Sequence, residues 1–180
     1  MPLCFLKSMS SLGPKWVKRK LGNFRQDRMK ISKTAQTGGP LSEKLALHLP
    51  FGLIGLRELT HFELEPAGEG MPFQVLRAEG GGFFEFVVID PTVLLEGYTC
   101  VLRDEDVESL RIRRIEDALV LNIVAIHSHD PQFVTVNLVG PIVVNRATLI
   151  GQQVILANSA EFSTDHVLVD HRPSREPQAP

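Results

Sequence analysis

The chain has 180 residues, of which 43% are apolar, and a formal net charge of −2 at pH 7. This length allows one domain with a real hydrophobic core, and no apolar run is long enough to predict a membrane-spanning helix. The two cysteines, Cys4 and Cys100, exclude a disulfide framework and favour the reducing cytoplasm. The opening residues are too polar, over too short a stretch, for a secretory signal peptide.

The net charge conceals a strong asymmetry between two parts of the chain. Residues 1–40 carry nine lysines and arginines against one acidic residue, Asp27, which gives a charge of +8. Residues 41–180 carry ten basic and twenty acidic residues, which gives −10, so the two parts together give −2. We therefore expect an acidic domain that favours a basic protein surface over nucleic acid.

Three segments are predicted: a basic leader over residues 1–40, a domain over residues 41–169 and a tail over residues 170–180. The leader has no sustained apolar period, which predicts a disordered segment. It is interpreted as a dispensable tail, as the product of a start codon upstream of Met29, or as a basic arm that touches RNA, membrane or the acidic body. The tail is rich in proline and polar residues and is expected to fray.

Between these ends the pattern predicts short strands separated by glycine and proline. In chain order they are expected at residues 44–50, 61–66, 73–79, 83–91, 118–127, 134–145 and 152–157. Residues 134–145 consist of two short apolar runs joined by Gly140-Pro141. The strand over 118–127 is apolar on both faces, which predicts that it is covered on both sides. The two glycines of residues 50–56 predict a bend or a close backbone contact. The glycine run at residues 80–82 predicts a hairpin between the strands on either side of it.

One helix is predicted in the stretch RDEDVESLRI, residues 103–112. Asp104 is the expected N-cap, and the carboxylates of Glu105 and Asp106 complement the positive end of the helix dipole. Short strands without regular helices between them indicate an antiparallel arrangement. The expected fold is therefore mainly β, a single antiparallel β-barrel-like domain with one short helix.

The stretch HSHD is the best candidate for catalytic chemistry. His127 and His129 lie two residues apart on an extended chain, so both imidazoles could face one zinc ion with Asp130 beside them, as in a metal-dependent hydrolase. No third strong ligand is indicated, and the preferred interpretation is a polar loop that leaves the strand. Cys100 is interpreted as a half-buried thiol. Nucleotide-binding and hydrolase motifs are absent from the sequence, so we expect neither an enzyme nor a cofactor.

Polar residues in unusual places supply the candidates for partner binding. Asparagine is a poor strand former, yet two asparagines lie among the branched side chains of residues 134–145. Their amides predict either bonds that fix turns or contacts with the backbone of a partner. An acidic run predicts either a solvated helix start or a patch that attracts a basic partner. The candidates are Asn137, Pro141, Asn145, Gln153, Asp104, Glu105, Asp106 and Glu108.

Several segments, taken in order, resemble the bacterial flagellar assembly factor FliW family. They are PFGLIGL, FELEP, FEFVVIDP, EDALVLNIV and VTVNLVGPIVVN, the last followed by GQQVIL. The resemblance runs from about Leu41 to Val169. It is anchored by the pattern Asn-Leu-x-x-Pro-Ile-Val-x-Asn, which begins here at Asn137 and ends at Asn145.

The resemblance implies a small β-barrel-like protein that acts in the cytoplasm and is not an enzyme. Proteins of this family bind newly made flagellin near its C-terminal helical region. They also bind CsrA, a small RNA-binding repressor of flagellin translation, and the two partners compete. We further expect no direct binding of nucleic acid by the folded domain, no membrane association and a monomer. The alternatives are the metal-dependent hydrolase and an adaptor for an unrelated protein.

Overall fold

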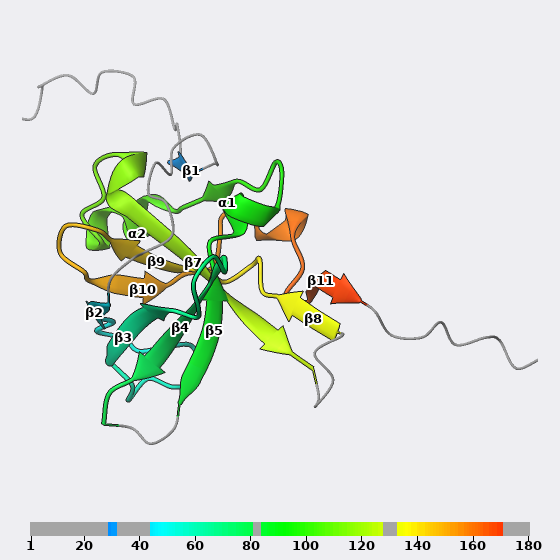
Figure 1. Ribbon diagram of the computed structural model, residues 1–180. Helices are drawn as coiled ribbons and strands as arrows, with labels where there is room; N and C mark the ends of the chain where they lie inside the picture. The colour runs from blue at the N-terminus through cyan, green and yellow to red at the C-terminus, as the bar shows by residue number, and fades with distance from the viewer. Residues whose placement is uncertain (1–28, 32–43, 81–83, 128–132, 171–180) are drawn as a thin grey trace, which may run out of the picture.

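The computed structural model describes residues 29–31, 44–80, 84–127 and 133–170, and these residues are mainly β (Figure 1). The strands are β1 (Lys30–Ile31), β2 (Leu45–His48), β3 (His61–Pro66), β4 (Phe73–Ala78), β5 (Glu85–Ile89), β6 (Cys100–Val101), β7 (Ala118–Ile126), β8 (Phe133–Val136), β9 (Ile142–Asn145), β10 (Gly151–Gln153) and β11 (His166–Asp170). Two short helices, α1 (Pro91–Leu94) and α2 (Asp104–Ser109), and two 3-10 turns, η2 (Ile115–Asp117) and η3 (Ser159–Glu161), accompany them. The prediction of a mainly β fold is confirmed. The rest of the predicted leader and the predicted tail beyond residue 170 lie outside these ranges.

One antiparallel sheet follows the order β10-β9-β7-β5-β4-β3-β2, and β8 pairs with β7 and with β11. The predicted hairpin around the glycine run is confirmed, because β4 and β5 pair in antiparallel register. The two end strands, β10 and β2, do not form a ladder with each other. A single bridge joins His48, the last residue of β2, to Ile150, and the His48 N–H donates to the Leu149 carbonyl at 2.9 Å. The sheet is therefore barrel-like without being closed.

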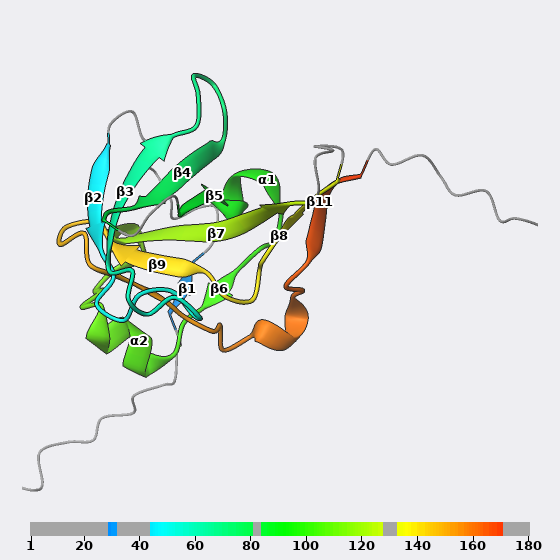
Figure 2. The ribbon, with the colours of Figure 1, turned by 90° about the horizontal axis from the view of Figure 1, so that it is seen from below.

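Strands β7 and β9 are buried on both faces because they separate two hydrophobic cores. Val120 and Val143 face one core, which also contains residues of β1 and β6. Leu121 and Ile142 face the other, which β2 to β5 surround. In Figures 1 and 2, β7 runs between the group β2, β3 and β4 and the pair β8 and β11. The predicted two-sided burial is confirmed for residues 118–122, and the strand becomes exposed from Ala125 onward.

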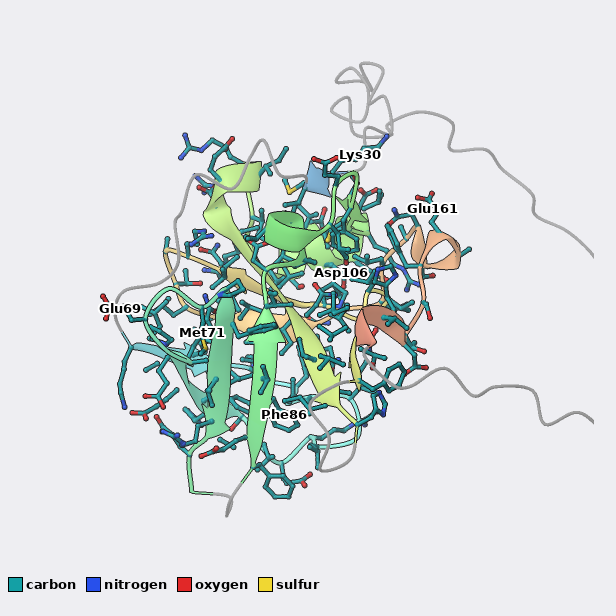
Figure 3. All side chains as sticks on the ribbon, turned by 45° about the vertical axis from the view of Figure 1, so that its right-hand side comes forward. Lys30, Glu69, Met71, Phe86, Asp106 and Glu161 are labelled. Atoms are coloured by element: carbon teal, nitrogen blue, oxygen red, sulfur yellow. The ribbon has the colours of Figure 1, made fainter. Side chains whose placement is uncertain are left out.

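Strand β1 places part of the predicted leader inside the folded body. Ile31 is fully buried, and β1 pairs with β6 so that Lys30 lies opposite Val101 and Ile31 lies opposite Cys100. Lys30 projects outward at the upper edge of the molecule in Figure 3. The domain therefore includes a segment that lies before the boundary predicted at residue 40. A strand of two residues carries no detectable period, and only its contact with distant segments reveals it.

Helix α2 begins one residue earlier than predicted. Its N-cap is Arg103, which makes no capping bond through its side chain, so Asp104 is the first helical residue. Glu105 and Asp106 lie in the first turn, as expected. Carboxylates at this end complement the positive end of the helix dipole. The negative charge of the acidic run therefore favours the helix start, and the N-cap side chain makes no capping bond.

Helix α1 is a single turn that the sequence did not predict. Pro91 opens it, and the carboxylate of Asp90 accepts the N–H and the O–H of Thr92 at 2.9 and 2.6 Å. Proline at the first helical position and aspartate at the cap are both favourable for a helix start. The turn is too short to show an apolar period. Among the described residues no helix has the length and apolar character needed to cross a membrane.

Replacing Ile31 with alanine should lower the free energy of unfolding by about 2–5 kcal/mol, because it leaves a cavity in a packed core. Replacing its exposed neighbour Lys30 with alanine should change that free energy by less than about 0.5 kcal/mol. Urea denaturation of the two variants measures the difference. Equal stabilities would mean that β1 does not unfold together with the rest of the domain.

Candidate protein-binding site

The segment between β8 and β9 is a large bulge in the sheet. Both strands pair with the same edge of β7, where Val136 lies opposite Val124 and Ile142 lies opposite Leu121. Between these two pairs β7 has two residues, whereas the segment that joins β8 to β9 has five, residues 137–141. The bulge therefore contains three extra residues. A bulge of this size interrupts the ladder, and its backbone needs other hydrogen-bond partners.

Side-chain amides supply those partners. The Oδ1 of Asn137 accepts the backbone N–H groups of Val139 and Gly140, both at 3.0 Å. Asn122 of β7 is fully buried and donates its amide to the carbonyl oxygen of Asn137. Asparagine forms such local turns readily, and its amide is costly to bury unless it is bonded. Asn137, the asparagine among the branched side chains of this segment, therefore stabilises the bulge.

Tyr98 supports the bulge from the buried side. Its hydroxyl donates to the Leu138 carbonyl at 2.9 Å and lies 3.4 Å from the amide nitrogen of Asn122. Burial raises the pKa of the Tyr98 hydroxyl. Cys100 is fully buried, rather than half-buried as predicted. Burial raises the pKa of its thiol to about 12, so the thiol stays protonated at neutral pH.

Asn145 fixes a second turn at the end of β9. It is 4% exposed, and its amide nitrogen donates to the Leu110 carbonyl at 2.9 Å. Its Oδ1 accepts the N–H of Ala147 at 2.9 Å and that of Thr148 at 3.3 Å. These bonds join the end of α2 to the turn after β9. Asn145 is therefore a buried residue that positions the backbone segments to which it is hydrogen-bonded.

Gln153 connects the bulge to a loop that is distant in the sequence. Its Oε1 accepts the N–H of Ile54 at 2.8 Å, and its Nε2 donates to the Gly140 carbonyl at 3.1 Å. One side chain thus holds the loop over residues 50–57 against the bulge. The structure brings Gln153 together with Asn137 around this bulge, whereas Asn145 lies at the other end of β9.

Pro141 closes the bulge and limits β10. Pro141 is buried, and its carbonyl accepts the N–H of Val154 at 2.9 Å. Farther along, the N–H of Leu156 donates to the Val139 carbonyl at 3.1 Å. The strand predicted over residues 152–157 therefore ends at residue 153, because the chain beyond it bonds to the irregular backbone of the bulge.

A groove of about 510 Å³ lies between the loop over residues 50–57 and β10. We call it the loop groove, and its lining includes Phe51, Ile54, Arg57, Gln152 and Gln153. Phe51 is 68% exposed and Ile54 is 63% exposed, although burial of such side chains is favourable. The sequence predicted a bend here, and the apolar residues beside its glycines are the signal that could have indicated an apolar loop.

The loop keeps its shape because its other residues are anchored. Leu53 is 2% exposed and exchanges two backbone hydrogen bonds with Leu56, at 3.2 and 2.9 Å. Gly52 has a φ of +63°, and a Cβ at this position would lie 2.5 Å from the Leu56 carbonyl oxygen. Only glycine fits such a position without displacement. The predicted close backbone contact at the glycines is confirmed at Gly52.

Helix α2 carries the predicted acidic run, but its members differ in exposure. Asp104, Glu105 and Glu108 are exposed, whereas Asp106 is only 8% exposed. We call the first three residues the acidic face. Asp104 and Glu105 also line a pocket of about 480 Å³, to which Leu156 contributes. The acidic face and the segment after β10 are therefore neighbours.

Carboxylates on the strands are largely neutralised by ion pairs. Arg77 lies 2.8 Å from Glu65 and 2.7 Å from Glu85. On α2 the only ion pair within the described ranges is a longer one, 3.6 Å, between Arg103 and Glu105. The acidic face therefore retains more of its negative charge than the strands do.

His127 directly follows β7 and makes contacts with β8. Its Nε2 lies 2.7 Å from the Thr135 hydroxyl, and its ring packs on Phe133 with the centroids 4.9 Å apart. His129 and Asp130, the other members of the predicted cluster, lie outside the described residues. Within the part of the chain that the structure describes, no three His, Cys, Asp or Glu side chains are grouped to hold a metal ion.

Replacing Gly52 with alanine should lower the free energy of unfolding by about 3 kcal/mol, because backbone strain and a clash with the Leu56 carbonyl add together. Gly55 also has a positive φ, +90°, but nothing lies within 4 Å of its Cβ position. Gly55→Ala should therefore cost only about 1 kcal/mol. Denaturant midpoints of the two variants test this, and equal losses would contradict the close contact at Gly52.

Asp106→Asn should stabilise the protein at neutral pH. Burial raises the pKa of the Asp106 carboxyl above its ordinary value, so its contribution to stability is present below about pH 4 and is lost as the pH rises through the raised pKa. The gain from the variant should therefore vanish in acid. Denaturant melts at several pH values measure it, with Asp104→Asn as the exposed control. A gain that does not depend on pH would contradict the burial argument.

The chain matches the family model described as FliW protein over residues 30–168. It is 32% identical over 128 residues to the flagellar assembly factor FliW of Leptospira interrogans (serogroup Icterohaemorrhagiae serovar Lai), a match that covers 71% of this chain and 85% of the relative. It is 36% identical over 117 residues to the flagellar assembly factor FliW of Clostridium novyi, and this match covers 65% of this chain and 80% of the relative.

The fold is also similar to a solved crystal structure of the flagellar assembly factor FliW. The TM-score is 0.64 at 26% sequence identity, and the match covers 81% of this chain and 100% of the solved chain. The family model begins at Lys30, the first residue of β1, which agrees with the inclusion of β1 in the folded body. The resemblance noted from the sequence motifs is thereby confirmed. The chain belongs to the FliW family of flagellar assembly factors.

Proposed function

We propose that this protein is a non-enzymatic regulator that binds flagellin and the translational repressor CsrA in the cytoplasm. Membership of the FliW family supports a role in flagellar assembly. The same resemblance implies the two partners. The observation that carries the proposal is the acidic face, where only one of the three exposed carboxylates, that of Glu105, makes an ion pair among the described residues.

The acidic face suits CsrA because an RNA-binding protein must present a basic surface. Opposite charges increase the rate of encounter and discriminate between partners. The bond from Asn145 to the Leu110 carbonyl holds the end of α2 in place. Exposed charges are screened over about 8 Å at physiological ionic strength, so this contact should weaken as salt is added.

The arrangement also supports exchange between two partners. The segment after β10 runs from Gln153, at the loop groove, to Leu156, at the acidic pocket. These three residues span at most about 11 Å. A protein partner of standard size covers about 800 Å² of surface, and a patch of that area is wider than this distance. A partner bound at one surface would therefore cover part of the other. Accumulated flagellin would occupy this protein and release CsrA, and flagellin synthesis would then fall until export removes the flagellin.

Changing Asp104, Glu105 and Glu108 together to lysine should weaken CsrA binding by about tenfold or more at physiological ionic strength, since like charges then face each other. Flagellin binding should weaken less. Asp106 keeps its identity in this variant because it is buried, and a lysine there would disturb the fold. Isothermal titration calorimetry with purified cognate CsrA and flagellin measures both affinities.

A matched variant separates the local surface from the total charge. Glu69, Glu79 and Glu96 are exposed residues outside α2, and changing all three to lysine alters the net charge equally. CsrA affinity should stay within about threefold of the original in this control. An unchanged CsrA affinity in the α2 variant would remove the acidic face from the proposal. A folded protein that binds neither partner at low salt would reject the proposed function.

A further inference from the structure

We propose that the loop groove binds an amphipathic segment of flagellin that carries a carboxylate beside its apolar side chains. This inference rests on the proposed function for the identity of the partner. The chemistry of the segment follows from the groove, which combines an exposed apolar pair, a rigid loop and a cation that pairs with no described carboxylate.

Phe51 and Ile54 are the two most exposed large apolar side chains among the described residues. Ile155, which is 40% exposed, extends the apolar surface along the bulge. Its Cδ1 and the Nε2 of Gln153 would each lie 3.6 Å from a Cβ on Gly140, so both pack over the same point of the backbone. Contiguous apolar surface of this kind on a folded protein marks an interaction site.

The loop presents the apolar pair in a fixed position. Leu49 is fully buried and Leu53 is 2% exposed, so both sides of Phe51 are anchored in the core. The N–H of Ile54 itself is held by Gln153 at 2.8 Å. Because the loop is already ordered, a partner loses little free energy in fixing it. This favours specific docking over non-specific contact.

Arg57 determines which kind of segment the groove accepts. It lines the groove, and it makes no ion pair within the ranges that the structure describes. Arg77, by contrast, is paired with two carboxylates. An unpaired guanidinium beside apolar side chains is complementary to a carboxylate on the partner.

The signs of charge on the two surfaces assign the partners. The acidic face on α2 attracts a basic protein, whereas Arg57 repels one, so the loop groove suits flagellin better than CsrA. A second copy of the folded domain is also disfavoured there, because residues 41–180 carry a charge of −10 and two such domains repel each other. The groove therefore receives the partner that the acidic face does not.

Two variants of the full chain test the inference. Phe51→Ser combined with Ile54→Ser should weaken the binding of purified cognate flagellin by tenfold or more, since the apolar contact is lost. Arg57→Glu should weaken it by about fivefold, and more at low salt, since the cation becomes an anion. CsrA affinity should stay within about twofold of the original in the apolar double variant, whose charge is unchanged. Calorimetry with each partner measures these affinities.

Matched controls remove exposed apolar side chains elsewhere. Phe84 is 42% exposed and Val93 is 54% exposed, and neither lines the loop groove. Phe84→Ser and Val93→Ser should leave flagellin affinity within about twofold of the original. Circular dichroism and denaturant midpoints verify that all variants are folded, which is expected because the altered side chains are exposed.

The outcomes separate this inference from the proposed function. Unchanged flagellin affinity in both groove variants overturns the inference and leaves the proposed function in place. Groove variants that lose CsrA and keep flagellin overturn the assignment of partners. A dimer in sedimentation experiments that the double variant abolishes would assign the groove to a second copy and overturn the inference. A folded original chain that binds neither partner removes the proposed function itself.

Discussion

Burial of both faces of β7 constrains the rest of the structure. Every side chain from Ala118 to Asn122 is buried, because β7 separates two hydrophobic cores and successive side chains enter opposite cores. This part of the strand has no solvent face on which polar groups can be placed. The one polar residue in this run, Asn122, donates a hydrogen bond to the carbonyl oxygen of Asn137 and so holds the bulge over residues 137–141 in place. The irregular surface features of the protein begin at that bulge.

Amide side chains transmit the shape of the bulge to the surface. Asn137 satisfies the backbone of the bulge itself, and Gln153 bonds both to the bulge and to the loop that carries Ile54. Asn145 performs the same task at the other end of β9, where it holds the carbonyl that follows α2. The conspicuous polar residues of the central segment therefore position two neighbouring surfaces, the loop groove and the acidic face.

The two surfaces differ in chemistry although they lie close together. Among the described residues, one combines apolar side chains with Arg57, which makes no ion pair, and the other combines exposed carboxylates with a single ion pair. On the strands, carboxylates such as Glu65 are paired with Arg77, which confines the free negative charge. Under the proposed function, local charge rather than the net charge of the domain selects the partner of each surface. Proximity of the surfaces then gives a physical basis for the competition that we propose.

The sequence by itself determined the strands β2 to β5 and β7, the acidic character of the domain and the family. Alternation and two-sided apolar runs are local properties, so β2 to β5 and β7 could be predicted from neighbouring residues. Only the tertiary structure decided that Ile31 belongs to the core and that Asp106 is buried beside exposed neighbours. It alone formed the loop groove, since the bond between Ile54 and Gln153 joins residues 99 positions apart. Contacts between distant segments depend on how the whole chain packs, and no local pattern encodes them.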